Sequence, residues 1–173
     1  MDYTLQTPFP VGQSSLICAN AHTIDSEGAT ISINSYLVSS AYSNSDSVQH
    51  WMSNFMHATG HICPFCGYSL KQVFRLIQPI PLLVIDLSSK NLYIDHSIEI
   101  GIMNSKKLYS LRGVFYYGMN HFTSRFISHE GTIWFHDGMT TNQKMEKEGM
   151  LDSKVDLLFC RDMHACGVIY EAL

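Results

Sequence analysis

Apolar and polar positions alternate in three consecutive runs between residues 108 and 136. The first run covers residues 108–116, the second begins at His121, and the third spans residues 132–136 after a Glu-Gly turn. Alternation with a period of two is typical of strands that bury one face. The pattern predicts three antiparallel strands joined by short turns. The apolar positions of the first run are Leu108, Leu111, Val114 and Tyr116.

The rest of the chain adds more strands and one helix. Residues 47–58 carry apolar side chains at helical spacing, with a serine or aspartate before them to cap the start and Gly60 to end it. Residues 1–15 and 138–154 lack periodicity, so we expect irregular structure there. The sum is an α+β fold built on a mostly antiparallel sheet. Strands are predicted at residues 29–38, 68–78, 81–88 and 163–173.

Composition narrows the class of protein. The 173 residues are 46% hydrophobic, which predicts one globular domain over residues 1–173. No apolar run is long enough to cross a bilayer, and the first ten residues do not resemble a signal peptide, so we expect an intracellular protein, cytoplasmic or nuclear. A net charge of −4 argues against nucleic acid as the partner and suits a basic one.

Two residues of the three-strand segment suggest catalysis. His121 stands at the start of one strand and Asp137 at the end of the next. A hairpin places these ends opposite each other, so the two side chains are predicted to come within hydrogen-bond reach. The aspartate would fix the tautomer of His121, whose other nitrogen could then take a proton from a thiol or hydroxyl. The competing interpretation is an ordinary surface pair.

A second group of residues has metal-ligand chemistry. His57, His61, Cys63 and Cys66 provide four potential ligands within ten residues, and Gly67 allows the backbone to turn toward the thiolates. A redox pair would need a helix after the first cysteine, whereas a strand is predicted there. A structural zinc ion is therefore the metal that we expect at this site. Cys160, His164 and Cys166 also lie close together, but buried cysteines in a core strand are the simpler interpretation.

The motifs of the C-terminal half resemble the histidine box of the ubiquitin-specific proteases, papain-like enzymes that cut after the C-terminal glycine of ubiquitin. One departure concerns the acid, because the family usually has one more aromatic residue between Trp134 and Asp137. The match extends over residues 16–173. The residues that carry the box are Tyr109, Leu111, Gly113, Val114, Gly118, His121, Phe122, Thr123, Gly131, Trp134 and Asp137.

The resemblance implies the fingers and palm of a papain-like cysteine protease with an incomplete thumb. Residues 16–70 would form the zinc-binding fingers and residues 71–173 the palm with the histidine box. His121 would be the general base and acid, and Asp137 would orient it. The residues implied to lie beside the substrate tail are Gly118, Asn120, Phe122 and Trp134.

The resemblance also implies the remaining zinc ligands. The family clamps one zinc between two Cys-x-x-Cys knuckles, and the segment from Cys18 to His22 stands where the first knuckle belongs. The implied ligands are thus Cys63, Cys66, Cys18 and His22, with His57 and His61 as rival local ligands. A histidine in place of a cysteine, one position further on, is acceptable to zinc.

The family's nucleophile box is not found. The one candidate is Cys18 with Gln13 as oxyanion donor, but the residues after Cys18 lack a helical period, and a zinc ligand cannot also attack a substrate. We expect a thiol-hydrolase domain that is inactive alone, completed by an upstream thumb segment or a second chain. The alternatives are a pseudoenzyme that binds ubiquitin or a ubiquitin-like protein without cutting it, and a zinc-stabilised adaptor module.

Overall fold

The computed structural model describes residues 10–21, 23–25, 31–32, 36–39, 46–53, 56–76, 79–87, 91–102 and 105–173. These residues form one short helix, α1 (Val48–Ser53), and fourteen strands. The strands before and just after the helix are β1 (Pro10–Ile17), β2 (Thr23–Asp25), β3 (Ile31–Ser32), β4 (Tyr36–Ser39), β5 (Met56–Ile62), β6 (Ser69–Leu76) and β7 (Leu82–Asp86). The later strands are β8 (Ser97–Ile102), β9 (Ser105–Gly118), β10 (His121–Ile127), β11 (Thr132–His136), β12 (Glu146–Met150), β13 (Phe159–Cys160) and β14 (Met163–Ala172).

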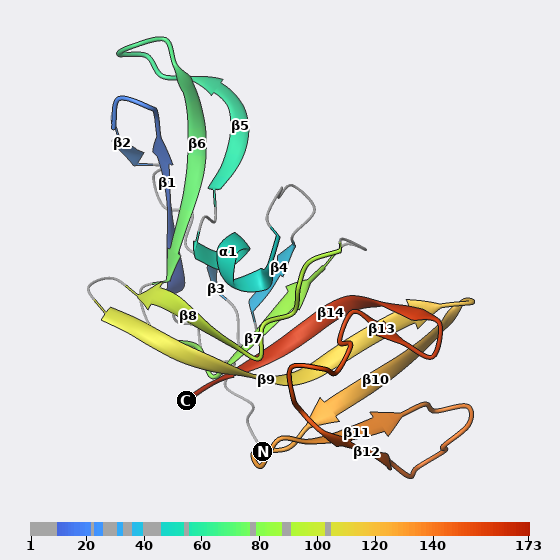
Figure 1. The fold of residues 1–173 in the computed structure, drawn as a ribbon. Coiled ribbons are helices and arrows are strands. Elements are labelled where there is room, and N and C mark those ends of the chain that lie inside the picture. Colours follow the sequence, from blue (N-terminus) through green and yellow to red (C-terminus); the bar gives the residue numbers. More distant parts are fainter. Residues whose placement is uncertain are drawn as a thin grey trace, which may run out of the picture.

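The strands belong to one sheet in the order β12-β11-β10-β9-β8-β6-β1-β2, to which β14, β7 and the shorter strands are attached. Most pairings are antiparallel, and the parallel ones join β4 to β7 and β6 to β8. Figure 1 shows a ribbon of β1, β2, β5 and β6 that extends away from the curved region formed by β7 to β14. The predicted mostly antiparallel sheet with little helix is confirmed.

Strand β9 organises the curved region because three strands pair with it. β8 and β10 pair with β9 at residues 105–110 and 113–118, and β14 pairs with both halves. The β9–β14 register shifts at Arg112, where β9 has one extra residue. This bulge explains why buried Leu111 and Val114 are three residues apart, since an extra residue reverses the faces of the strand.

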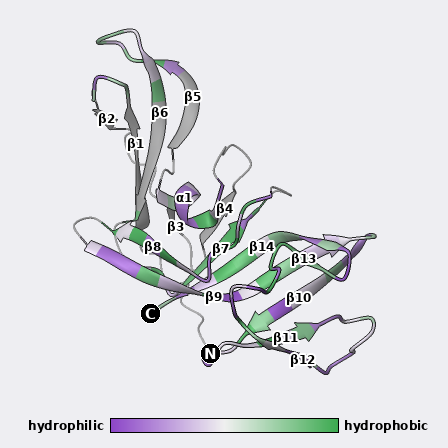
Figure 2. Ribbon diagram, viewed as in Figure 1, coloured by the Kyte–Doolittle hydropathy of each residue, from purple (hydrophilic) through white to green (hydrophobic). Residues whose placement is uncertain are grey.

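The main core lies between the curved sheet, α1 and the segment that precedes β13. Tyr109, Tyr116, Phe135 and Tyr170 are its largest fully buried side chains. Apolar positions gather along the central strand β14 in Figure 2. Two phenols are satisfied by backbone carbonyls, because Tyr116 donates to Leu157 and Tyr170 donates to Asp95. Buried hydroxyls of this kind need such partners.

Several predicted elements differ from the structure. The helix predicted over residues 47–58 ends at Ser53, and Met56–Ile62 forms β5, because pairing with β6 overrides a local helical spacing. The segments expected to be irregular contain most of β1 and all of β12, and residues 1–9 lie outside the described part. Strand β8 was not predicted. The strand expected at residues 29–38 is found as Ile31–Ser32 and Tyr36–Ser39, with residues 33–35 not described.

The strands predicted at residues 108–116, from His121 onward and at residues 132–136 are confirmed, as are those near residues 68–78, 81–88 and 163–173. The expected boundary between residues 70 and 71 falls inside β6, so the division into two parts stays a prediction. In the described ranges, no helix is both long and apolar enough to cross a membrane.

Candidate functional site

A tight hairpin places His121 at the start of β10. Gly118 pairs with His121, and the two residues between them, Met119 and Asn120, have φ values of 51° and 58°. Two consecutive positive φ values define the type I′ turn, whose twist matches that of paired strands. The Asn120 side chain accepts a hydrogen bond from the Tyr117 hydroxyl at 3.2 Å. A two-residue turn thus fixes the register between β9 and β10, and with it the position of His121.

The side chains of His121 and Asp137 are hydrogen bonded. Nε2 of His121 lies 2.7 Å from Oδ1 of Asp137, and the backbone N–H of Met139 donates to the same oxygen at 2.8 Å. Burial would raise the pKa of Asp137, but the hydrogen bonds from Met139, His121 and Thr140 lower it to about 2. The carboxylate is therefore ionised at neutral pH and holds the Nε2–H tautomer of the imidazole.

Asp137 reaches His121 from a loop rather than from a strand. β11 ends at His136, so the alternation of faces no longer constrains the next residue. The loop closes on itself, because Asp137 accepts backbone hydrogen bonds from Thr140 and Thr141 at 3.2 and 2.8 Å. The register difference from the family's usual spacing therefore does not keep the acid from the histidine.

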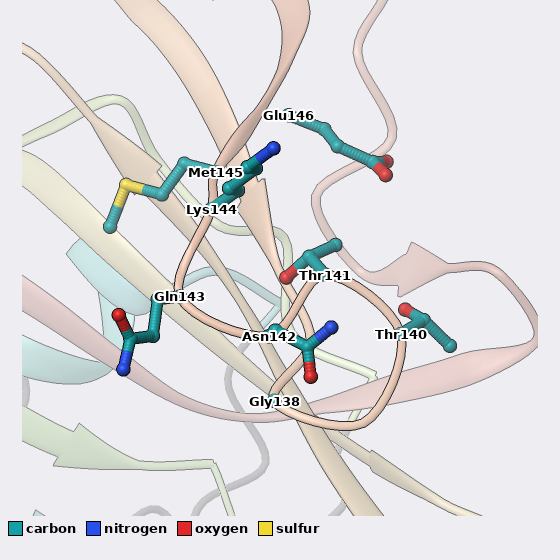
Figure 3. A pocket seen from close by; sticks show the side chains of 8 residues that line it. All are labelled: Gly138, Thr140, Thr141, Asn142, Gln143, Lys144, Met145 and Glu146. Atoms are coloured by element: carbon teal, nitrogen blue, oxygen red, sulfur yellow. The ribbon is translucent and has the colours of Figure 1, made fainter.

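The loop after Asp137 has a hollow of about 810 Å³ on its surface, lined by Gly138 and residues 140–146. Figure 3 shows Thr141 inside the loop, whereas Gln143 and Met145 extend away from it. Thr140 and Thr141 were not predicted from the sequence as residues of the site. The signal was there, since hydroxyl residues three and four positions after an aspartate are typical of turns closed by side-chain hydrogen bonds.

The second ring nitrogen of His121 is open. Among the described residues, none forms a hydrogen bond with Nδ1, and the side chain is 23% exposed. No cysteine sulfur contacts the imidazole in this part of the chain. Asp137 therefore orients the ring, and among the described residues no thiol lies against its second nitrogen.

Of the four residues expected beside the substrate tail, two lie at the turn before His121 and two lie on the opposite face of the sheet. Gly118 and Asn120 belong to the turn before His121. Phe122 is 63% exposed and contacts Tyr117, with ring centroids 4.6 Å apart. Successive residues of a strand point to opposite faces, so Phe122 lies on the face opposite His121, and Trp134 shares that face through its pairing with Phe126.

Three thiols gather at the far end of the ribbon. The sulfur atoms of Cys18, Cys63 and Cys66 lie within 4.8 Å of one another, and Cys18 and Cys66 are 3.5 Å apart. Three thiolates bound to one tetrahedral zinc at about 2.3 Å would be roughly 3.8 Å apart. The separations and the thiol chemistry fit a metal site in which three of the four ligands are cysteines.

The backbone around Cys63 and Cys66 turns as a metal knuckle requires. The Gly67 N–H donates to the Cys63 carbonyl at 2.9 Å, and Gly67 has a φ of 73°, which favours glycine. The backbone hydrogen bond from Tyr68 lowers the pKa of Cys66, but burial and the two neighbouring thiols raise it above its ordinary value overall. A bound cation would relieve this crowding of acidic groups.

The fourth ligand is not identified by the described residues. His22 lies outside them, and the side chain of His57 is also not described. His61 is exposed and does not belong to the cluster of three sulfurs. Of the predicted set, the structure brings together Cys18, Cys63 and Cys66.

Cys18 is distant from His121 along the sheet. Strands β9, β8 and β6 separate β10 from β1, and Figure 1 places the β1–β2 turn and the start of β10 at opposite ends of the molecule. The backbone of Gln13 pairs with Arg75 in the middle of the ribbon, and its side chain is not described. The structure groups Cys18 with the metal-type thiols and not with the histidine.

Comparisons with known proteins reveal a shared fold. No family model matches the sequence, and no curated protein matches it. Among solved structures, a chain of the SAGA DUB module Ubp8/Sgf11/Sus1/Sgf73 bound to monoubiquitin matches 95% of this chain with a TM-score of 0.60 and 11% identity. The module bound to ubiquitin aldehyde gives a TM-score of 0.61 at 10% identity over 95% of this chain. A yeast SAGA DUB module with a mutant Sgf73 gives a TM-score of 0.64, also at 10% identity and 95% coverage.

This chain has the Ubp8-type fold. The resemblance to ubiquitin-specific proteases predicted from the histidine box is thus confirmed at the level of the fold. The alignments cover 40%, 41% and 40% of the three matched chains, so this chain corresponds to well under half of their length.

Proposed function

We propose that this chain is the ubiquitin-binding part of a ubiquitin-specific-protease-type domain and supplies the histidine and aspartate of a Cys-His-Asp triad. The carrying observation is the 2.7 Å contact between Nε2 of His121 and Oδ1 of Asp137 within a Ubp8-type fold. The modifier would be ubiquitin or a ubiquitin-like protein. Residues 16–70 would act as zinc-bearing fingers, and residues 71–173 as the palm.

In the proposed reaction, His121 takes a proton at Nδ1 from a cysteine thiol that an upstream segment or a second chain supplies. The thiolate attacks the carbonyl carbon of the modifier's C-terminal glycine, and the imidazolium returns the proton to the leaving amine. Water, deprotonated by the same nitrogen, then hydrolyses the thioester and regenerates the thiol. Asp137 remains ionised throughout and stabilises the imidazolium.

Zinc is the proposed ion of the thiol cluster. Cys18, Cys63 and Cys66 would supply three thiolates, and His22 would complete the tetrahedron. The ion would hold the β1 and β6 ends of the ribbon together. Its role would be structural, since the cluster lies far from His121 along the sheet.

A second candidate is a pseudoenzyme that binds the modifier without cutting it. It is favoured by one observation, namely that no described cysteine contacts His121. Loss of one member of a triad leaves a rate on the order of a millionfold below that of the intact enzyme. The third candidate is a zinc-stabilised adaptor without affinity for ubiquitin. It would not bind ubiquitin in a titration, whereas the pseudoenzyme would.

The test combines titration calorimetry with plain ubiquitin and labelling with a ubiquitin probe that carries a C-terminal electrophile. Binding without labelling is expected for a chain that lacks its own nucleophile. Labelling that disappears in Cys18→Ser but persists in Cys166→Ser would identify Cys18 as the nucleophile and contradict the proposed division of the triad. Absence of binding would contradict the ubiquitin-related function as a whole.

A further inference from the structure

Thr141 holds both backbone polar groups of Asp137. The Thr141 hydroxyl accepts a hydrogen bond from the Asp137 N–H at 3.1 Å and donates one to the Asp137 carbonyl at 2.8 Å. Both residues are 7% exposed, so water has little access to these groups. One buried hydroxyl therefore fixes the peptide groups on both sides of the Asp137 α-carbon.

The Asp137 amide depends on this hydroxyl. The ladder between β10 and β11 ends at the pair formed by Ser124 and His136, so it does not satisfy the next amide. A buried N–H without an acceptor is strongly disfavoured. Without the hydroxyl of Thr141, the peptide group before Asp137 would have to rotate toward water, and the carboxylate would turn with it.

The carboxylate has a narrow set of productive positions. Its Oδ1 must lie near the Met139 N–H and the His121 imidazole together, and both contacts are shorter than 3 Å. The loop is also attached to β11, because Nε2 of His136 lies 2.9 Å from the carbonyl of Asn142. Thr141 lies between these two attachments, on the inner side of the loop in Figure 3.

We propose that Thr141 is a positioning residue, which locks the Asp137 backbone so that its carboxylate keeps His121 in the Nε2–H tautomer with the Nδ1 lone pair free. This inference rests on the proposed function, because the free lone pair matters only if His121 acts as a base. Both hydrogen bonds that the Thr141 hydroxyl forms in the described structure go to Asp137, so Thr141 acts on the imidazole through Asp137. A threonine or serine is required at this position, whereas a side chain of equal size without a hydroxyl fails.

The experiment is nitrogen-15 NMR of the histidine side chains in the wild-type chain and in Thr141→Val, Thr141→Ser and Thr132→Val. The two ring nitrogens have different shifts in the two neutral tautomers, which makes the readout independent of activity and of ubiquitin. Thr132→Val is the matched control, since it removes a half-buried hydroxyl of the same hairpin whose hydrogen bond in the described structure goes to the sulfur of Met150. Amide spectra verify that each variant is folded.

We expect the Nε2–H tautomer of His121 to dominate in the wild type, Thr141→Ser and Thr132→Val, and to be lost to a tautomer mixture in Thr141→Val. An unchanged tautomer in folded Thr141→Val, with ubiquitin binding intact, would overturn this inference and leave the proposed function standing. A wild type without a tautomer preference would overturn both. If Thr141→Val does not fold, hydrogen exchange in the wild type decides instead. Slow exchange of the Asp137 amide supports its hydrogen bond to the Thr141 hydroxyl, and exchange as fast as that of the exposed Gly138 amide overturns the inference.

Discussion

Asp137 accepts a hydrogen bond from His121 at 2.7 Å although sixteen positions separate the two residues and the acid lies beyond the end of its strand. The I′ turn brings the histidine to one end of β10, and the loop after β11 brings the aspartate to the same end. Because the loop rather than the strand sets the direction of the carboxylate, a one-residue difference in spacing from the ubiquitin-specific proteases is tolerated.

The ionised form of Asp137 stabilises the fold, and this predicts a pH dependence. Its pKa is lowered from an ordinary 3.8 to about 2, so its contribution is complete above pH 3.8 and is lost as the pH falls through about 2. The Asp137→Asn variant has no carboxylate at this position, so its stability does not change through protonation of this side chain. We therefore expect the difference in unfolding temperature between the wild type and Asp137→Asn to shrink over this window. Asp152→Asn, which changes an exposed acid that caps a turn, is the control. A difference that is constant with pH would show that the carboxylate is not stabilised by its partners.

Gly118, which precedes the His121 turn, packs against Met163 of β14. A β-carbon at Gly118 would lie 3.1 Å from the Cγ and 3.3 Å from the Cα of Met163. We expect Gly118→Ala to lower the free energy of unfolding by about 1 to 3 kcal/mol, because the Met163 backbone cannot move easily. Gly101→Ala in β8 is the matched control, since nothing lies within 4 Å of its added carbon. Urea unfolding measures both, and equal stabilities would mean that β14 moves freely there.

Much of the curved region could be predicted from the sequence. Residues 108–136 carry a period-two pattern strong enough to define three strands, and hairpin geometry predicted that the start of β10 and the end of β11 lie close together. The thiol cluster followed in part, because spacing indicated Cys63 and Cys66, and the family resemblance added Cys18. Local periodicity and short connections were sufficient for these features.

The remaining features depend on contacts between distant residues. β12 reads Glu-Lys-Glu-Gly-Met, a polar segment with no strand pattern, and it forms only because β11 offers a free edge. β5 begins at Met56, the last residue of the apolar pattern with helical spacing, and is a strand because β6 pairs with it. The hydrogen bonds between the Thr141 hydroxyl and the Asp137 backbone depend on where the β10–β11 ladder ends, and no single-residue preference specifies the end of the ladder.

Removal of the metal should destabilise the ribbon. Cys63 is 1% exposed at the centre of the cluster, and in small knuckle domains the binding energy of the metal is folding energy. We expect Cys63→Ser to lose the bound zinc and to unfold at a lower temperature, and a chelator to have the same effect on the wild type. Metal content by mass spectrometry and thermal unfolding are the measurements. Cys166→Ser, in β14 outside the cluster, should keep its metal. A wild type whose unfolding is insensitive to chelator would rule out a structural ion.

Arg125 holds the segment before β14 against β10. Its guanidinium donates to the Glu148 carboxylate at 2.6 Å, the Asp156 carbonyl at 2.6 Å and the Tyr116 hydroxyl at 3.2 Å, with 13% of the side chain exposed. Lysine keeps the charge but cannot reproduce this planar fork. We expect Arg125→Lys to cost about 2 to 4 kcal/mol in urea unfolding, since several charge-assisted hydrogen bonds are lost. Lys106→Met, which removes an exposed ion pair with Glu99, should cost about 1 kcal/mol or less. Similar losses in both variants would mean that the Arg125 contacts contribute little.

The most direct measurement is photo-crosslinking of the chain to ubiquitin that carries a photoreactive group at its C-terminus, followed by mass-spectrometric mapping. We expect crosslinks on the turn at residues 118–121, which carries His121, and on the loop at residues 137–141, which carries its hydrogen-bond partner Asp137. Competition by unmodified ubiquitin should abolish them. Crosslinks confined to other surfaces, or none that ubiquitin competes away, would contradict a ubiquitin-tail site at His121 and Asp137.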